Sequence, residues 1–219
     1  MRKFAAFDID HTITKDFAFG VEFVHMLSAT LFPSEHQIID KAYREWTMAN
    51  HEDRPVIFDK YLRPYFRQKM PGLTREQLED IGRRVAVKAL NYLNTWTTDR
   101  IALRKSEGYF LIALTFSPKI AVQSFAEHFG FDELWAPGMI FDDHGIMISS
   151  EHYDAQLWDK GNRLSELIKS YDLNINDSDA YGDSKHDIPM LEIAQNSFAV
   201  NPEPLLYEAA IQNGWEIIR

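Results

Sequence analysis

Residues 3–9 form a short, largely apolar segment, and the aspartates Asp8 and Asp10 stand at its carboxyl end. A run of this length without polar alternation is typical of a parallel strand that is buried on both faces of a sheet. In open α/β sheets, ligands bind at the carboxyl ends of the strands. The segment therefore predicts a parallel sheet with two carboxylates at its ligand-binding edge.

Residues 17–95 show a helical pattern and contain no second segment of this kind. Apolar residues such as Phe19 and Phe23 recur at three- and four-residue spacing, which is the helical period. The sequence Thr74-Arg-Glu-Gln is a capping box, which marks the start of the last helix of the region. Helices that follow one another without a strand predict a separate helical bundle.

The position of this bundle predicts its role. Because it is inserted directly after the first strand, we expect it to cover the carboxyl end of that strand and Asp8. Its connections to the rest of the chain, near residues 15–16 and 95–98, are short and polar, as hinges often are. Closing an active site in this way excludes water and completes the binding site. We therefore expect residues 17–95 to move as a lid.

Strand and helix alternate again after residue 95. The pattern predicts, in chain order, a strand at 109–115, a hairpin over 139–148, a helix over 159–171, a strand at 178–181, and a strand–helix–strand ending over 198–218. Ser117 and Pro118 are expected to begin the helix after the first of these strands. The fold class predicted is α/β, with a doubly wound, Rossmann-like parallel sheet core of residues 1–16 and 96–219. Residues 17–95 form a helical-bundle cap domain inserted into it.

Composition excludes several classes of protein and site. With 33 acidic and 23 basic residues, the formal net charge is −10, which disfavours non-specific nucleic-acid binding because that requires a basic face. The absence of cysteine excludes disulfides, thiolate metal sites and a cysteine nucleophile. The histidines are scattered, and none shows a metal-ligand spacing on a convincing helix face. No run of about 18 apolar residues occurs, so we expect a cytoplasmic protein without a membrane segment.

The motif Asp8-Ile-Asp10-His-Thr12 is the first candidate site. Two carboxylates at i and i+2, where a strand ends in a loop, can converge on one cation. Phosphoryl transfer needs a nucleophile, neutralisation of charge and an acid for the leaving oxygen. Aspartates are also common at strand ends as caps and turn residues, so the motif alone does not decide between the two interpretations.

A second acidic strand end favours the interpretation as a site. Gly182-Asp183-Ser-Lys-His-Asp187 also follows a strand and opens a helix, and its carboxylates suit a hard cation that prefers oxygen ligands. In a parallel sheet, both strand ends lie on the same edge. Thr115 ends another strand, where its hydroxyl can donate to a phosphoryl oxygen. Lys160 begins a helix, which is electrostatically unfavourable for a lysine. By itself it would be read as a solvated surface lysine, but beside the other motifs a functional reason is favoured.

The order of these residues resembles the four motifs of the haloacid dehalogenase superfamily: Asp8-x-Asp10-x-Thr12, Thr115, Lys160 and Gly182-Asp183-x3-Asp187. The helical insertion and the ending over residues 198–217 look like the phosphoserine-phosphatase-like branch of that superfamily. The resemblance implies that Asp8 is the nucleophile, and that Asp10 is the acid for the leaving alcohol and then the base for water. The implied cofactor is Mg²⁺, with the metal ligands Asp8, Asp10 (through its backbone carbonyl) and Asp183, the supporting residue Asp187, and the phosphoryl-holding residues Thr115 and Lys160.

The sequence departs from that branch at two positions around the first motif. Phosphoserine phosphatases carry a glutamate nine residues after the nucleophile to hold the substrate amine, whereas this chain has Phe17, with Asp16 next to it. His11 stands where glycine, serine or asparagine is more usual. We therefore expect phosphoserine to be a poor substrate, and a small phosphomonoester of different or more apolar character to be preferred. The candidate substrate-binding residues are Thr12, Asp16, Phe17 and Arg54, with Arg44, Trp46 and Arg63 as further candidates in the cap.

Other functions stay open or are disfavoured by particular features. A phosphotransferase or phosphomutase on the same scaffold would use the same motifs, and a catalytically inactive metal-binding scaffold is a further alternative. A dehalogenase is disfavoured because a halide leaves without a proton, which gives Asp10 no use. A signalling receiver domain is disfavoured because it is much shorter and carries its acidic pair before the phospho-accepting aspartate. We expect a small phosphorylated metabolite as the partner, and neither nucleic acid nor a membrane; the sequence does not specify an oligomeric state.

Overall fold

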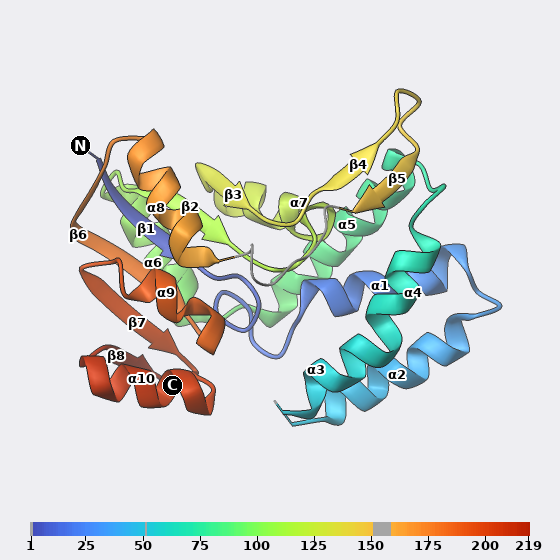
Figure 1. Ribbon diagram of the computed structural model, residues 1–219, viewed down its shortest axis with the longest axis horizontal. Coiled ribbons are helices and arrows are strands. Elements are labelled where there is room, and N and C mark those ends of the chain that lie inside the picture. The colour runs from blue at the N-terminus through green and yellow to red at the C-terminus, as the bar shows by residue number, and fades with distance from the viewer. Residues whose placement is uncertain (1, 51, 151–158) are drawn as a thin grey trace.

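The computed structural model describes residues 2–50, 52–150 and 159–219 (Figure 1). Six strands form one parallel sheet in the order β3-β2-β1-β6-β7-β8. The strands are β1 (Arg2–Phe7), β2 (Phe110–Leu114), β3 (Glu133–Trp135), β6 (Leu173–Gly182), β7 (Asn196–Val200) and β8 (Glu216–Ile218). The chain winds outwards from β1 to β3 on one side and from β6 to β8 on the other. This confirms the predicted doubly wound α/β core and places the ligand-binding edge at the ends of β1 and β6, where the order reverses.

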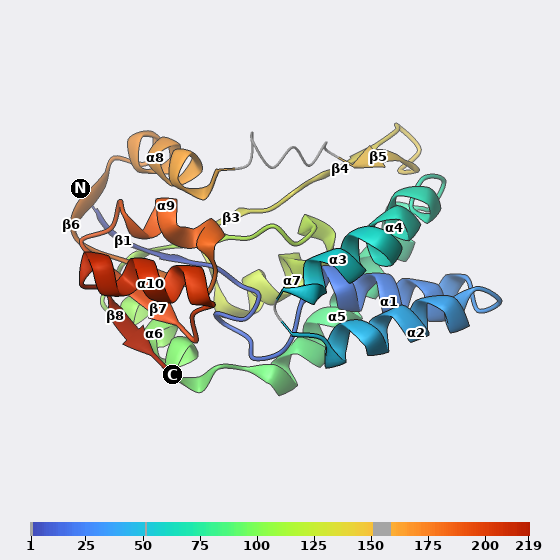
Figure 2. The same cartoon turned by 60° about the horizontal axis from the view of Figure 1, so that its bottom comes forward.

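The buried part of β1 and the whole of β2 are apolar because helices cover both faces of the sheet (Figure 2). Alternate residues of β1 point to opposite faces, so that Phe4 and Ala6 belong to one buried cluster and Ala5 and Phe7 to the other. The first cluster is covered by the helices α8 (Lys160–Ser170), α9 (Ile188–Leu191) and α10 (Pro204–Asn213). The second is covered by α6 (Thr95–Ser106) and α7 (Lys119–Phe129).

The inserted helical region lies beside the sheet (Figure 1). Its helices are α1 (Phe19–Leu31), α2 (His36–Met48), α3 (Asp53–Ile57), α4 (Arg63–Lys69) and α5 (Arg75–Ala89). The π-helical turn Phe58–Leu62 joins α3 to α4, so these two continue as one helical segment. The predicted capping box of α5 is confirmed: Gln77 N donates to the Thr74 hydroxyl (3.2 Å), and Thr74 N donates to the Gln77 side chain (2.9 Å).

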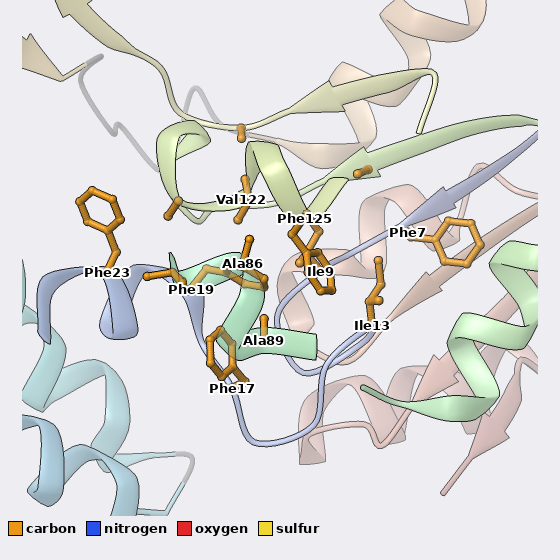
Figure 3. Close-up of a cluster of buried hydrophobic side chains, with 14 of the residues drawn as sticks. Phe7, Ile9, Ile13, Phe17, Phe19, Phe23, Ala86, Ala89, Val122 and Phe125 are labelled. Atoms are coloured by element: carbon orange, nitrogen blue, oxygen red, sulfur yellow. The ribbon is translucent and has the colours of Figure 1, made fainter. Parts of the chain in front are cut away.

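The helical region has two layers, and its inner layer, α1 with α5, continues the hydrophobic core of the sheet (Figure 3). Phe19 and Phe23 of α1 and Ala86 of α5 belong to the same buried cluster as Val122 and Phe125 of α7. The outer layer, α2 with α3 and α4, packs on the opposite face of α1. Its separate cluster contains Val21, Val24, Ile39, Ala42, Trp46, Leu62 and Tyr65. The inner layer is therefore part of the core, whereas the outer layer has a core of its own.

Backbone contacts also fix the inner layer. The two connections to the sheet pair with each other, because Lys15 N donates to Tyr92 O (2.6 Å) and Asn94 N donates to Ile13 O (2.8 Å). Residues 95–98, near which the second hinge is predicted, form the first turn of α6.

The hairpin of β4 (Met139–Phe141) and β5 (Met147–Ser150), which the sequence predicts, reaches the start of α5. Met147 N donates to Leu73 O (2.8 Å), and Gly72 N donates to Met147 O (2.9 Å). The hairpin thereby attaches the amino end of α5 to the core. Among the described residues, no helix is both long and apolar enough to cross a membrane.

Candidate active site

The residues that follow β1 and β6 converge, because these two strands are neighbours in the sheet. Asp8 N donates to Tyr181 O (2.9 Å), which extends the pairing of the strands to the first aspartate. Asp8, Asp183 and Asp187 each have a carboxylate oxygen within 4.8 Å of one from the other two. All three residues are buried. The structure thus brings together three of the predicted site residues from two distant parts of the chain.

Lys160 joins this carboxylate cluster from the first position of α8. Its Nζ atom lies 2.5 Å from Oδ1 of Asp8 and 2.5 Å from Oδ1 of Asp187, and its side chain is 2% exposed. Asp159 caps the helix by accepting a hydrogen bond from Asn162 N (2.9 Å). The two carboxylates therefore offset the unfavourable interaction of the lysine with the helix dipole.

Burial changes the protonation of the cluster. It raises the pKa of Asp8 to about 7, against the lowering effect of Lys160, while the charges of Asp187 and Asp10 raise it further. It also raises the pKa of Asp183 well above the usual range, and Asp8 and Asp187 act in the same direction. For Lys160, burial alone would lower the pKa, but the two carboxylates raise it overall, so the ammonium stays charged. The remaining negative charge and the oxygen donors fit a hard divalent cation such as Mg²⁺.

Asp187 is oriented by the loop that follows β6. Its Oδ2 atom accepts hydrogen bonds from Asp183 N (3.0 Å), Ser184 N (2.9 Å) and the Ser184 hydroxyl (3.1 Å), which leaves Oδ1 facing Lys160. A Cβ atom at Gly182 would lie 2.6 Å from Cγ of Asp187. Glycine is therefore needed at this position, because any side chain would push the carboxylate away from the lysine.

The carboxylate of Asp10 lies outside this cluster and has two partners of its own. Its Oδ2 atom accepts from the Thr115 hydroxyl (3.0 Å), and its Oδ1 atom accepts from Phe19 N (2.6 Å). Thr115 is fully buried and also accepts from Ser117 N (3.0 Å). Asp10 is thus held between the end of β2 and the first residue of α1.

The start of α1 is capped by residues of the core. Ala18 precedes the helix and provides no side-chain cap, so the first backbone amides need other partners. Phe19 N donates to Asp10, and Gly20 N donates to Ser117 Oγ (3.1 Å). The prediction that Ser117 begins α7 is wrong, because α7 starts at Lys119 without a side-chain cap and the Ser117 hydroxyl serves α1 instead.

Thr12 lies beneath the carboxylates and has no exposed surface. Its hydroxyl lies 3.0 Å from Asp8 Oδ2 and 3.4 Å from Asp183 Oδ1. The structure therefore places Thr12 where it orients the carboxylate cluster, rather than at the surface of the cleft.

A cleft of about 880 Å³ opens between the core and the helical region, next to these groups. Asp10 and Asp183 lie on its core side. Its apolar lining comes from both sides and includes Val24, Phe58, Phe66, Phe116 and Pro118. Arg54, Arg63 and Arg67 line the cap side, so the cleft combines apolar walls with cationic groups opposite the carboxylates.

A side pocket of about 460 Å³ adjoins the cleft and contains the other predicted substrate residues. Phe17 is buried and packs against the rings of Phe19 and Tyr92, while Asp16 is exposed in a left-handed conformation (φ 51°). Arg54 lines both the cleft and the pocket. Its guanidinium lies 4.6 Å from the centroid of the Trp46 ring, and its Nε atom is buried without a hydrogen-bond partner among the described residues.

Glu22 is a pocket residue that the sequence analysis did not single out. It is 3% exposed and accepts hydrogen bonds from the Tyr43 hydroxyl (2.8 Å) and the Lys88 ammonium (2.6 Å). The signal available in the sequence was a glutamate between the apolar residues Val21 and Phe23. Arg44, a further cap candidate, pairs with Asp40 and does not line either cavity.

The sequence matches one protein family over most of its length and parts of several known proteins. Residues 5–192 match the family described as haloacid dehalogenase-like hydrolase. The chain is 31% identical over 111 residues to the inhibition of morphological differentiation protein of Streptomyces azureus. The matched segment is 51% of this chain and 40% of that protein. It is also 36% identical over 58 residues to a phosphoserine phosphatase of Mycobacterium tuberculosis. This segment is 26% of this chain and 19% of that protein. The matches thus span less than half the length of these relatives.

The fold is similar to solved structures over the whole chain. A protein of unknown function from Bordetella pertussis Tohama I has a TM-score of 0.73 at 19% identity, with 100% of this chain and 99% of that chain covered. A substrate-bound phosphoserine phosphatase has a TM-score of 0.65 at 22% identity, with 100% and 93% covered. At these identities the likeness concerns the fold. Because the family match extends over residues 5–192, this chain belongs to the haloacid dehalogenase-like hydrolase family.

Proposed function

We propose that this chain is a Mg²⁺-dependent phosphomonoester hydrolase that works through a phospho-aspartate on Asp8. The observation that carries the proposal is the buried cluster in which Lys160 contacts both Asp8 and Asp187, beside a cleft that Asp10 and Asp183 line. A carboxylate nucleophile, a fixed ammonium and a second, separately held carboxylate are the groups that phosphoryl transfer requires.

The first half of the reaction would use the cluster. Asp8, Asp183 and the backbone carbonyl of Asp10 would hold Mg²⁺, with Asp187 in support. When bound, the ion neutralises the carboxylates and the phosphoryl group. The Asp8 carboxylate attacks phosphorus, and the bond between phosphorus and the leaving oxygen breaks. Lys160 would hold a phosphoryl oxygen during this step, and Thr115 would hold another by turning its hydroxyl from Asp10 to the phosphoryl group.

Asp10 would move the protons. It donates a proton to the leaving alcohol, and its ionised form then accepts a proton from the water that attacks the phospho-aspartate. Phosphate leaves, and Asp8 returns to its free form. The position of Asp10 at the cleft, between the Thr115 hydroxyl and Phe19 N, supports this role because both partners fix its orientation toward the leaving group.

The substrate would be a small phosphorylated metabolite whose leaving group is more apolar than serine. The apolar lining of the cleft supports this, and so does Phe17, whose ring is buried where a carboxylate would be needed to hold an ammonium group. Arg54, which lines both the cleft and the side pocket, would contact an anionic or polar group of the substrate. The cytoplasmic location expected from the sequence stays a prediction.

The proposal is tested by measuring inorganic phosphate released from a panel of phosphomonoesters that includes an aryl phosphate and phosphoserine. We expect release to require Mg²⁺, to stop in excess chelator and to be absent in Asp8→Asn. We also expect kcat/KM for phosphoserine to be at least about tenfold below that of the best substrate, or about 1.4 kcal/mol. Full activity in chelator contradicts the metal requirement, and phosphoserine as the best substrate contradicts the interpretation of Phe17. Transfer to an added alcohol without free phosphate would favour a phosphotransferase.

A further inference from the structure

A second group of potential metal ligands lies in the helical region, on the packed helices α1 and α2. It consists of His25 on α1 and of His36 and Asp40 on α2. Each has a donor atom within 4.8 Å of those of the other two, and all three are partly exposed. His36 and Asp40 are four residues apart on one helix and so share a face, which is the face turned toward His25. Two helices thus present three convergent ligands.

The donor set selects the kind of ion. Two imidazole nitrogens and one carboxylate oxygen suit zinc and neighbouring transition metals, whereas Mg²⁺ prefers oxygen ligands alone. Partial exposure of the ligands leaves room for a water molecule as a fourth ligand. The carboxylate cluster of Asp8, Asp183 and Asp187 has only oxygen donors, so the two sites differ in the ion that they favour.

Hydrogen bonds of the Ser28 hydroxyl determine which ring nitrogen of His36 carries the proton. The Ser28 hydroxyl donates to His25 O (2.8 Å), and the same oxygen lies 2.9 Å from His36 Nδ1. With its only proton directed to that carbonyl, the hydroxyl accepts from Nδ1–H of His36. This tautomer is neutral and leaves a lone pair on Nε2. Imidazole binds a metal in this neutral form.

The other two ligands are held in a similar way. The His25 ring stacks on Tyr43, with 4.0 Å between centroids, and its Nε2 atom lies 3.1 Å from Asp40 Oδ1. Its Nδ1 atom lies 4.0 Å from the buried carboxylate of Glu22, so a proton moved from Nε2 to Nδ1 would face that carboxylate. Arg44 binds the other oxygen of Asp40, Oδ2, at 2.8 Å. A metal on Oδ1 therefore leaves the ion pair with Arg44 intact.

We propose that His25, His36 and Asp40 form a binding site for a zinc-class transition-metal ion that cross-links α1 to α2. The ion takes the place of the hydrogen bond between His25 and Asp40. Because α1 and α2 both line the cleft, through Val21 and Trp46 among others, the bound ion fixes the wall that faces the substrate. This site is separate from the proposed catalytic cluster and does not depend on the activity of the enzyme.

The test is calorimetric titration of Zn²⁺ into tag-free protein in excess Mg²⁺, with thermal unfolding as a second readout. Wild type and Asp8→Asn should each bind one Zn²⁺ per chain and unfold at higher temperature with the ion present. His36→Ala and Asp40→Asn should weaken binding by about tenfold or more. His144→Ala, which removes an exposed histidine of the β4–β5 turn, should bind as wild type does.

The outcomes separate this site from the catalytic one. Zn²⁺ binding that disappears in Asp8→Asn would assign the ion to the carboxylate cluster and overturn the proposal. No binding by wild type, or equal binding by wild type and Asp40→Asn, would overturn it as well. Asp40→Asn preserves the size of the side chain, so it decides the matter even if His36→Ala does not fold.

Discussion

The Nζ atom of Lys160 lies 2.5 Å from Oδ1 of Asp8, and both side chains are buried at the carboxyl edge of the sheet. The pair joins the first strand to a helix that starts far along the chain. Because the same ammonium also contacts Asp187, its charge holds two carboxylates that would otherwise repel each other. This contact is therefore expected to matter for stability as well as for activity.

We predict that Lys160→Met destabilises the metal-free protein by about 3–5 kcal/mol, since it leaves buried carboxylates without their partner. Lys169→Met is the matched control, because Lys169 is an exposed lysine in the last turn of the same helix. Urea unfolding in chelator measures both free energies, and the control should differ from wild type by less than about 0.5 kcal/mol. Added Mg²⁺ should recover part of the loss in Lys160→Met. Equal stability of the two variants would show that the buried ion pair contributes nothing.

The raised pKa of Asp8 predicts how the metal-free protein responds to pH. The folded-state pKa is about 7, above the ordinary value of 3.8, so the folded state binds more protons than the unfolded state between these values. Stability should therefore fall as the pH rises from about 4 to about 7. Thermal unfolding in chelator across this range should show a shallower fall in Asp8→Asn than in wild type, because the asparagine does not titrate. Identical slopes for the two proteins would contradict the assignment. Bound Mg²⁺ should reduce the fall in wild type, since it favours the ionised carboxylates.

Gly82 of α5 packs closely on α7, and this contact predicts the effect of a larger side chain at that position. A Cβ atom at Gly82 would lie 2.0 Å from the Ile120 carbonyl oxygen, whereas one at Gly20 has no neighbour closer than 3.4 Å. We predict that Gly82→Ala destabilises the protein by about 1–3 kcal/mol through overpacking. Gly20→Ala should be neutral, or stabilising by up to about 1 kcal/mol, because alanine favours a helix. Urea unfolding of the two variants checks this, and equal values would contradict the close approach of α5 to α7.

This packing also refines the lid expected from the sequence. α1 and α5 share one buried cluster with α7, so we expect them to stay with the core. The outer layer, α2 to α4, has its own cluster, and we expect any closure over the cleft to occur there. Hydrogen exchange with and without a phosphate mimic should show changed protection in α2 to α4 and little change in α5. Changes of equal size in both layers would support movement of residues 17–95 as one body.

The parts of the fold that the sequence predicts are those with a strong local pattern. β1 and β2 are buried on both faces, so their sequences are apolar runs. The capping box marks the start of α5. β3 has only three residues, and the first half of β6 is polar and partly exposed, so neither shows such a pattern. α6 has no strong pattern either, because its buried face includes only Thr97 and Ile101.

The candidate site divides in the same way. The convergence of Asp8 with Asp183 follows from the rule that parallel strands end on one edge, so it could be predicted. The contact of Asp10 with Phe19 N depends on how α1 enters the sheet edge, which no local pattern specifies. The group of His25, His36 and Asp40 needs two helices packed in one register, and so the histidines looked scattered in the sequence.

The most direct test of the account is to locate the phosphate on the enzyme during turnover. Asp10→Asn removes the proposed acid and base, but an aryl phosphate has a leaving group that needs little help from an acid. Mixing this variant with an aryl phosphate and Mg²⁺, followed by acid quenching and peptide mass spectrometry, should therefore show a phosphorylated peptide with the modification on Asp8. The double variant Asp8→Asn with Asp10→Asn should show none. Phosphate on any other residue would contradict the central claim, and so would continued turnover by Asp8→Asn.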